Sequence, residues 1–137
     1  MPGTGSILIV DNERAIVDLL VDLLTDEGYV VYTAPDGASA LAAVARHSPA
    51  LILLDMGRLG LRGAALIAQV RRAGPAILPI VLMTTTPREA RLLLVPGSIE
   101  CLDKPFDIDD VLVRVARYVQ PTQTLGVGWP DISAVAP

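Results

Sequence analysis

The sequence has very few of the residues that build disulfides and cysteine–histidine metal sites. Its 137 residues include one cysteine, Cys101, and one histidine, His47. A single cysteine excludes an internal disulfide, and these two residues cannot form the cysteine–histidine clusters that bind zinc. His47 follows a short predicted helix, where we expect it to be exposed to solvent and not to act as a ligand.

The chain also lacks an excess of positive charge and any long hydrophobic run. It has 11 basic and 15 acidic residues, a net charge of -4, so it has no basic surface of the kind that binds nucleic acid. No apolar run approaches the roughly 20 residues that cross a bilayer. The first six residues lack the basic and apolar regions of a signal peptide. We therefore expect a cytoplasmic protein that contacts neither membranes nor nucleic acid directly.

What the sequence does contain is typical of a single packed domain. Hydrophobic residues make up 52% of the chain and charged residues 19%, a balance that favours a globular core over disorder. From residue 121 the chain shows proline, glycine, threonine and isolated hydrophobic residues without periodicity. We predict a domain over residues 1–120 and a tail or linker over 121–137, in a protein that either stands alone or is part of a longer chain.

Five short runs predict strands, and those at 6–10, 51–55 and 79–83 are apolar enough to be buried in the sheet. The five runs lie at residues 6–10, 29–33, 51–55, 79–83 and 99–102. Runs that are apolar throughout, without alternation, are typical of a parallel sheet covered by helices on both sides.

Segments with helical spacing of apolar residues follow these strands. The predicted helices cover about 13–27, 38–46, 64–72, 87–95 and 107–120. The first has an apolar stripe at Ile16, Leu19, Leu20, Leu23 and Leu24, and the last at Ile108, Val111, Leu112, Val115 and Val119. Five strands that alternate with five helices predict a flavodoxin-like (βα)5 fold, a doubly wound α/β fold whose parallel sheet has strand order 2-1-3-4-5.

Polar side chains follow four of the predicted strands. Asp11 and Asn12 come after the first strand, Asp55 ends the third, Thr84 follows the fourth and Lys104 follows the fifth. Strands 1 and 3 are neighbours in this order, so the two aspartates converge at the edge where such sheets bind ligands. Their oxygens suit Mg²⁺, and a carboxylate beside that metal can attack phosphorus to form an acyl phosphate.

The order and spacing of these residues resemble the receiver domains of two-component response regulators, over residues 6–118. The resemblance implies that Asp55 accepts a phosphoryl group from a histidine kinase or phosphotransfer protein. It also implies that Mg²⁺ is held by Asp11, Asn12, Asp55 and the backbone carbonyl of Gly57.

The same resemblance assigns the residues that respond to the phosphoryl group. Thr84 is the switch hydroxyl and Thr85 follows it, while Lys104 is the lysine of the site and precedes Pro105 across a cis peptide bond. Signalling would then change the affinity of the surface around helices 4 and 5 for a downstream protein.

Two valines on the first predicted helix, Val17 and Val21, lie beside its apolar stripe. They form either the margin of a broad core face or a surface on which a partner helix docks.

The chain departs from the receiver pattern at several positions. Asn12 stands where the family has an acidic metal ligand, which removes a negative charge and predicts weaker metal binding. Thr85 replaces a small residue, Leu59 replaces a proline, and Cys101 occupies the position of the aromatic switch residue. As a small hydrophobic residue, Cys101 is expected to be buried.

These departures leave an alternative open, in which the chain is a degenerate receiver that binds proteins independently of phosphorylation. Retention of Asp11, Asp55, Thr84 and Lys104 favours the phosphorylated receiver.

We do not expect an enzyme. An aspartate-dependent phosphatase requires a second carboxylate two residues after Asp55, where the sequence has Gly57, and no glycine-rich phosphate loop suited to a flavin follows the first strand.

Overall fold

A computed structural model describes residues 3–55, 61–73, 78–84 and 99–121 of the chain. Its centre is a five-stranded parallel sheet with strand order β3-β2-β4-β5-β6. The strands are β2 (Ser6–Val10), β3 (Val30–Ala34), β4 (Leu51–Asp55), β5 (Ile80–Thr84) and β6 (Ile99–Asp103). Counted along the five strands of this sheet, the order is 2-1-3-4-5, which confirms the predicted flavodoxin-like fold.

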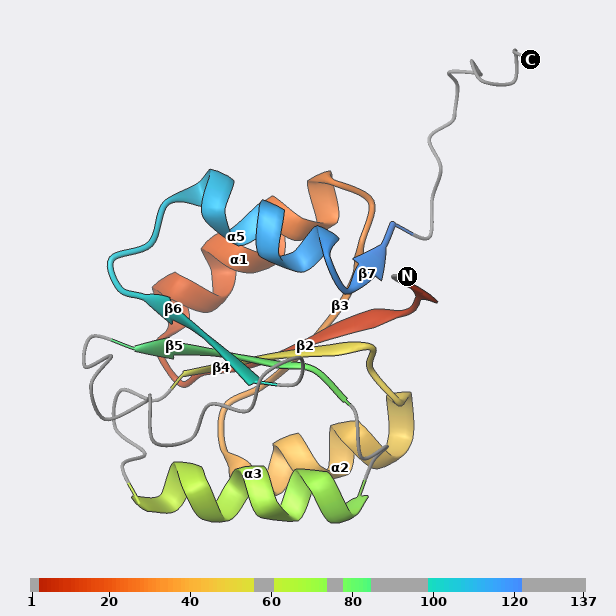
Figure 1. Cartoon of the computed structure of the whole chain (residues 1–137), viewed down its shortest axis with the longest axis vertical. Coiled ribbons are helices and arrows are strands. Elements are labelled where there is room, and N and C mark those ends of the chain that lie inside the picture. Colours follow the sequence, from red (N-terminus) through yellow and green to blue (C-terminus); the bar gives the residue numbers. More distant parts are fainter. Residues whose placement is uncertain (1–2, 56–60, 74–77, 85–98, 122–137) are drawn as a thin grey trace.

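Helices cover both faces of this sheet (Figure 1). On one face lie α1 (Arg14–Asp26) and α5 (Ile108–Ala116), and on the other lie α2 (Gly37–His47) and α3 (Leu61–Ala73). The helix predicted at 87–95 falls in a segment outside the described residues. The prediction for α3 began too late, because Leu61–Gly63 already belong to the helix although glycine disfavours helical structure.

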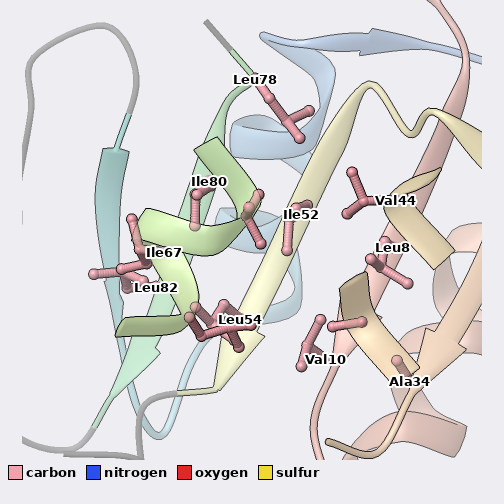
Figure 2. Packing of buried hydrophobic residues seen from close by; sticks show 13 residues of the cluster. Leu8, Val10, Ala34, Val44, Ile52, Leu54, Ile67, Leu78, Ile80 and Leu82 are labelled. Atoms are coloured by element: carbon pink, nitrogen blue, oxygen red, sulfur yellow. The ribbon is translucent and has the colours of Figure 1, made fainter. Parts of the chain in front are cut away.

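Alternate strand residues point to opposite faces of the sheet and fill two separate cores. The core toward α2 and α3 contains Leu8, Val10, Ile52, Leu54, Ile80 and Leu82 from the strands, which meet Val44 and Ile67 from the helices (Figure 2). The core toward α1 and α5 contains Ile7, Ile9, Leu51, Leu53, Val81 and Met83. Burial on both faces explains why these strands are apolar throughout.

The buried face of α1 is rotated relative to the predicted stripe. Leu20 and Leu24 are fully buried, but Leu19 is 43% exposed. Val17 and Val21 are instead half-buried and pack against the core. A spacing of three and four residues fits either face of this leucine-rich helix, so the contacts with the sheet decide between them. The helix ends as predicted before Gly28, whose φ of 92° is the left-handed conformation that glycine adopts readily.

The last helix is shorter than predicted. α5 buries Val111 and Val115, but Ile108 in its first turn is 45% exposed. Val119 is buried outside the helix, in β7 (Val119–Gln120), which pairs in parallel with β1 (Gly3–Thr4). This two-residue pairing is too short to produce a periodic pattern in the sequence. It joins the two ends of the described chain, beside the N-terminus in Figure 1.

Over the described ranges, no helix combines the length and the apolar character that crossing a bilayer requires.

Candidate functional site

Two carboxylates lie side by side at the carboxyl edge of the sheet. Asp11 directly follows β2, and Asp55 is the last residue of the neighbouring strand β4. Both are buried, with exposed fractions of 5% and 9%. Every residue of β2 and β4 is buried, so the carboxylates at the ends of these two strands are buried too. Two buried carboxylates this close need a positive charge beside them.

Lys104 supplies that positive charge. Its Nζ lies 2.8 Å from Oδ1 of Asp55 and 3.9 Å from Oδ2 of Asp11. The backbone holds it there, because the Lys104 N–H donates to the carbonyl of Thr84 over 2.7 Å. The peptide bond between Lys104 and Pro105 is cis. Three residues that the sequence placed at one edge therefore form one contiguous cluster.

Asp11 is the electrostatically unusual member of the cluster. Its Oδ1 accepts the backbone N–H of Glu13 over 2.9 Å, which fixes the carboxylate at the start of α1. Its Oδ2 is buried and has no hydrogen-bond partner among the described residues. Burial and then the charge of Asp55 raise the pKa of Asp11, against the Glu13 N–H and Lys104, which lower it. A buried, unsatisfied carboxylate oxygen is suited to a cation or to a water that a cation holds.

A small cavity of about 40 Å³ opens between this cluster and α2. Its lining residues are Val10, Asp11, Asn12, Pro35, Asp36, Gly37 and Asp55. A volume of this size accommodates one or two waters or a hydrated ion in part. Asn12, which the sequence placed among the metal ligands, is exposed and borders this cavity.

The donor set fits Mg²⁺ more closely than a metal that needs many protein ligands. No three histidine, cysteine, aspartate or glutamate residues converge in a metal-binding group within the described part of the chain. Two carboxylates, an amide and room for water match the way Mg²⁺ binds, through few protein ligands and several waters. The fourth residue of the expected ligand set, Gly57, lies outside the described residues.

The expected switch residues divide between the described and undescribed parts of the chain. Thr84 ends β5 at the same sheet edge and is 1% exposed, whereas Thr85 and Leu59 lie outside the described residues. Cys101 lies on the edge strand β6 and is only half-buried, contrary to the expectation of full burial. An edge strand lacks a neighbour on one side, which leaves the cysteine partly open, 3.7 Å from a carboxylate oxygen of Asp103.

A wide groove lies beside the other edge strand, β3. Val17 and Val21 line it from α1, together with Tyr32 from β3 and His47 from α2. The two rings stack, with centroids 3.6 Å apart and planes inclined by 10°. His47 is therefore half-buried against a tyrosine and not exposed as expected, because β3 brings Tyr32 under the end of α2.

Asp36 is the residue at this site that the sequence did not single out. Its place in a Pro-Asp-Gly turn indicated only a loop, and no periodicity relates that turn to Asp11 or Asp55. The signal available was its position two residues after a strand, at the edge where ligands bind.

Comparison with known proteins identifies what this arrangement resembles. The model of the response regulator receiver domain matches residues 7–116. The chain is 31% identical over 119 residues to the probable transcriptional regulatory protein TcrX of Mycobacterium tuberculosis, covering 85% of this chain and 50% of that protein. The chain thus spans about half the length of this curated relative.

Solved structures agree with this match. The receiver domain of NtrX from Brucella abortus is 33% identical, with a TM-score of 0.72 over 82% of this chain and 96% of that one. The chemotaxis protein CheY4 of Vibrio cholerae is 27% identical, with a TM-score of 0.72 over 85% of this chain and 99% of that one.

Proposed function

Because the chain belongs to the response regulator receiver family, we propose that it accepts a phosphoryl group on Asp55 and signals its phosphorylation state to another protein. The observation that carries the proposal is the contact of Lys104 with Asp55 beside the buried Asp11. Stability alone does not explain the whole cluster, since a buried group of paired charges contributes little net free energy compared with apolar residues in its place.

The proposed reaction forms an acyl phosphate. A carboxylate oxygen of Asp55 attacks the phosphorus of a phosphohistidine, the new O–P bond forms, and the P–N bond to the donor imidazole breaks. Lys104 is close enough to Asp55 to balance the charge that the phosphoryl group adds. Thr84 lies at the end of the adjacent strand. Its hydroxyl then binds a phosphoryl oxygen, and this contact transmits the phosphorylation state to the rest of the domain.

Asp11, Asn12 and Asp55 are the described residues that would hold Mg²⁺, with Gly57 contributing its backbone carbonyl as the family pattern implies. The metal would neutralise phosphoryl oxygens during transfer. The unsatisfied Oδ2 of Asp11 supports this assignment. Thr85 and the Cys101 position belong to the proposed switch region.

The proposed donor is a sensor histidine kinase or a phosphotransfer protein in the cytoplasm. Val17 and Val21 are half-buried on α1 and line the same groove as Asp11 and Asn12. They are the proposed contact with the donor. The downstream partner is a protein, and the domain itself binds neither nucleic acid nor membrane in this proposal. Residues 121–137 serve as a tail or linker.

Intact mass spectrometry tests the proposal directly. Wild type and Asp55→Asn are incubated with a small acyl phosphate in millimolar MgCl2 or in EDTA. We expect the wild type to gain one phosphoryl group only with metal, and Asp55→Asn to gain none. Asp103→Asn is the matched control, because Asp103 is an exposed carboxylate at the end of the edge strand β6, and it should be labelled like the wild type.

Absence of labelling in the wild type would overturn this proposal and favour the degenerate receiver. Asn12, which lacks the acidic charge, and Cys101, which cannot rotate as an aromatic switch, are the residues that support that alternative.

A further inference from the structure

We propose that Asp36 supplies, through water, the negative charge that Asn12 does not bring to the cation site. Asp36 would then tune the affinity of the site for a divalent cation without being a direct ligand. This inference rests on the proposed Mg²⁺ site, and it concerns a residue that neither the motif nor the metal ligand set includes.

The position of Asp36 is well defined. It is the N-cap of α2, and its Oδ1 accepts the backbone N–H of Ser39 over 2.8 Å. It borders the same 40 Å³ cavity as Asp11, Asn12 and Asp55. Its carboxylate is thus held at the N-terminus of α2, beside the cavity.

An independent observation indicates that this cavity takes a cation or cation-bound water. Asp11 lines the cavity, and its Oδ2 is buried with no hydrogen-bond partner in the described chain. The described residues contain no group of three acidic or imidazole ligands. Asp36 therefore acts across the cavity through waters that fill it, as Mg²⁺ commonly keeps part of its hydration shell.

The charges around the cavity explain why Asp36 would matter. Two carboxylates and the ammonium of Lys104 leave the cluster with a net charge of -1 because position 12 is an amide. Asp36 adds a further negative charge, and it also offsets the positive end of the α2 dipole, which would repel a cation. Hydrogen bonds from Ser39 lower the pKa of Asp36, so the carboxylate is ionised at neutral pH.

The test is a titration of the full chain with MgCl2 at constant ionic strength. The NMR signals of the backbone amides of Glu13 and Ser39 are recorded at each MgCl2 concentration. These amides bond to Asp11 and Asp36, so the first reports the site and the second reports the cap. The variant is Asp36→Asn, because asparagine caps a helix as well as aspartate and only the charge is lost. We expect its Mg²⁺ dissociation constant to rise roughly threefold, as for a unit charge in a hydrated, partly screened setting.

Two further variants make the result specific. Asp36→Ser also keeps a capping oxygen and should match Asp36→Asn. Asp26→Asn removes the same charge at the last residue of α1, at the opposite edge of the sheet, and should bind Mg²⁺ like the wild type. Equal affinities for wild type and Asp36→Asn would overturn the inference, as would equal weakening by Asp26→Asn.

Failure of this inference and failure of the proposed function have different signatures. A chain that is phosphorylated on Asp55 but binds Mg²⁺ equally with and without the Asp36 charge overturns only the role of Asp36. A wild type that does not bind Mg²⁺ also overturns it, since Asp36 would then not compensate for Asn12. A chain that shows the Asp36 effect but takes up no phosphoryl group supports the inference and overturns the proposed function.

Discussion

The ammonium of Lys104 lies 2.8 Å from Oδ1 of Asp55 and within 3.9 Å of Oδ2 of Asp11, between two buried carboxylates that belong to adjacent strands. The ammonium of Lys104 thus lies beside the carboxylates that we propose bind Mg²⁺. The first two predictions follow from this competition between an internal and an external positive charge.

Replacing Lys104 by methionine keeps the aliphatic stem and removes the charge. Without divalent metal we expect the free energy of unfolding to fall by about 1.5–3 kcal/mol, because a charged hydrogen bond to a buried carboxylate is lost. Affinity for Mg²⁺ should increase on the order of tenfold, since the metal no longer meets a neighbouring positive charge. Thermal unfolding in EDTA and over a MgCl2 series measures both effects. Lys104→Arg keeps the charge and is the control, and unchanged Mg²⁺ affinity in Lys104→Met would contradict the prediction.

Replacing Asp11 by asparagine tests the cost of burying its charge. The pKa of Asp11 is raised in the folded protein, so the folded state binds this proton more tightly than the unfolded state. The stability that protonation contributes is fully present below about pH 3.8, the ordinary value, and is lost as the pH rises through the folded pKa.

Asp11→Asn cannot ionise and should therefore be more stable than the wild type at pH 7 in EDTA. The difference should disappear as the pH falls toward 3.8. Urea unfolding from pH 3.5 to 7.5 measures it. A variant less stable than wild type at pH 7 would show that attraction to Lys104 outweighs burial.

Gly5, just before β2, has no room for a side chain. A Cβ added there would stand 2.8 Å from the Cβ of Ala50, which is attached directly to the backbone of the neighbouring chain segment. The Ala50 N–H donates to the Ser6 carbonyl over 2.8 Å, so the segments cannot separate freely. We expect Gly5→Ala to cost about 1–3 kcal/mol in urea unfolding. Adding Ala50→Gly should recover most of this loss, and a double variant as unstable as Gly5→Ala would refute the steric explanation.

Arg114 joins α5 to β6. Its guanidinium contacts the carboxylates of Glu100 and Asp110 at 3.1 and 3.2 Å and donates to the carbonyl of Cys101 over 2.9 Å. We expect Arg114→Ala to destabilise the domain by about 1–2 kcal/mol, because its partly buried contacts with the Cys101 carbonyl and the Glu100 carboxylate are lost.

Arg117 provides the matched control for Arg114. It also contacts Glu100, at 3.5 Å, but its side chain is 59% exposed. Arg117→Ala should cost less than about 0.5 kcal/mol, as exposed ion pairs do. Equal losses in the two variants would mean that the carbonyl contact does not contribute.

The local sequence pattern was sufficient to predict secondary structure where the residues of a single element determine it. The apolar runs identified all five central strands to within one residue at each end, including the last strand, which extends one residue further, to Asp103. Pattern was insufficient where two faces of an element are similarly apolar. On α1 it wrongly assigned Leu19 to the core, because Leu19 and Val17 are both consistent with helical spacing and only the position of the sheet distinguishes them.

The sequence by itself determined the fold and the partners at the sheet edge. Buried strands that alternate with amphipathic helices allow few topologies, and in this one Asp11, Asp55, Thr84 and Lys104 must end at the same edge. Only the tertiary structure decided how these groups meet. It placed Lys104 against Asp55, left one oxygen of Asp11 unsatisfied, and brought the N-cap of α2 to the same cavity. Distances and burial depend on how strands and helices pack across long sequence separations, and no local pattern encodes them.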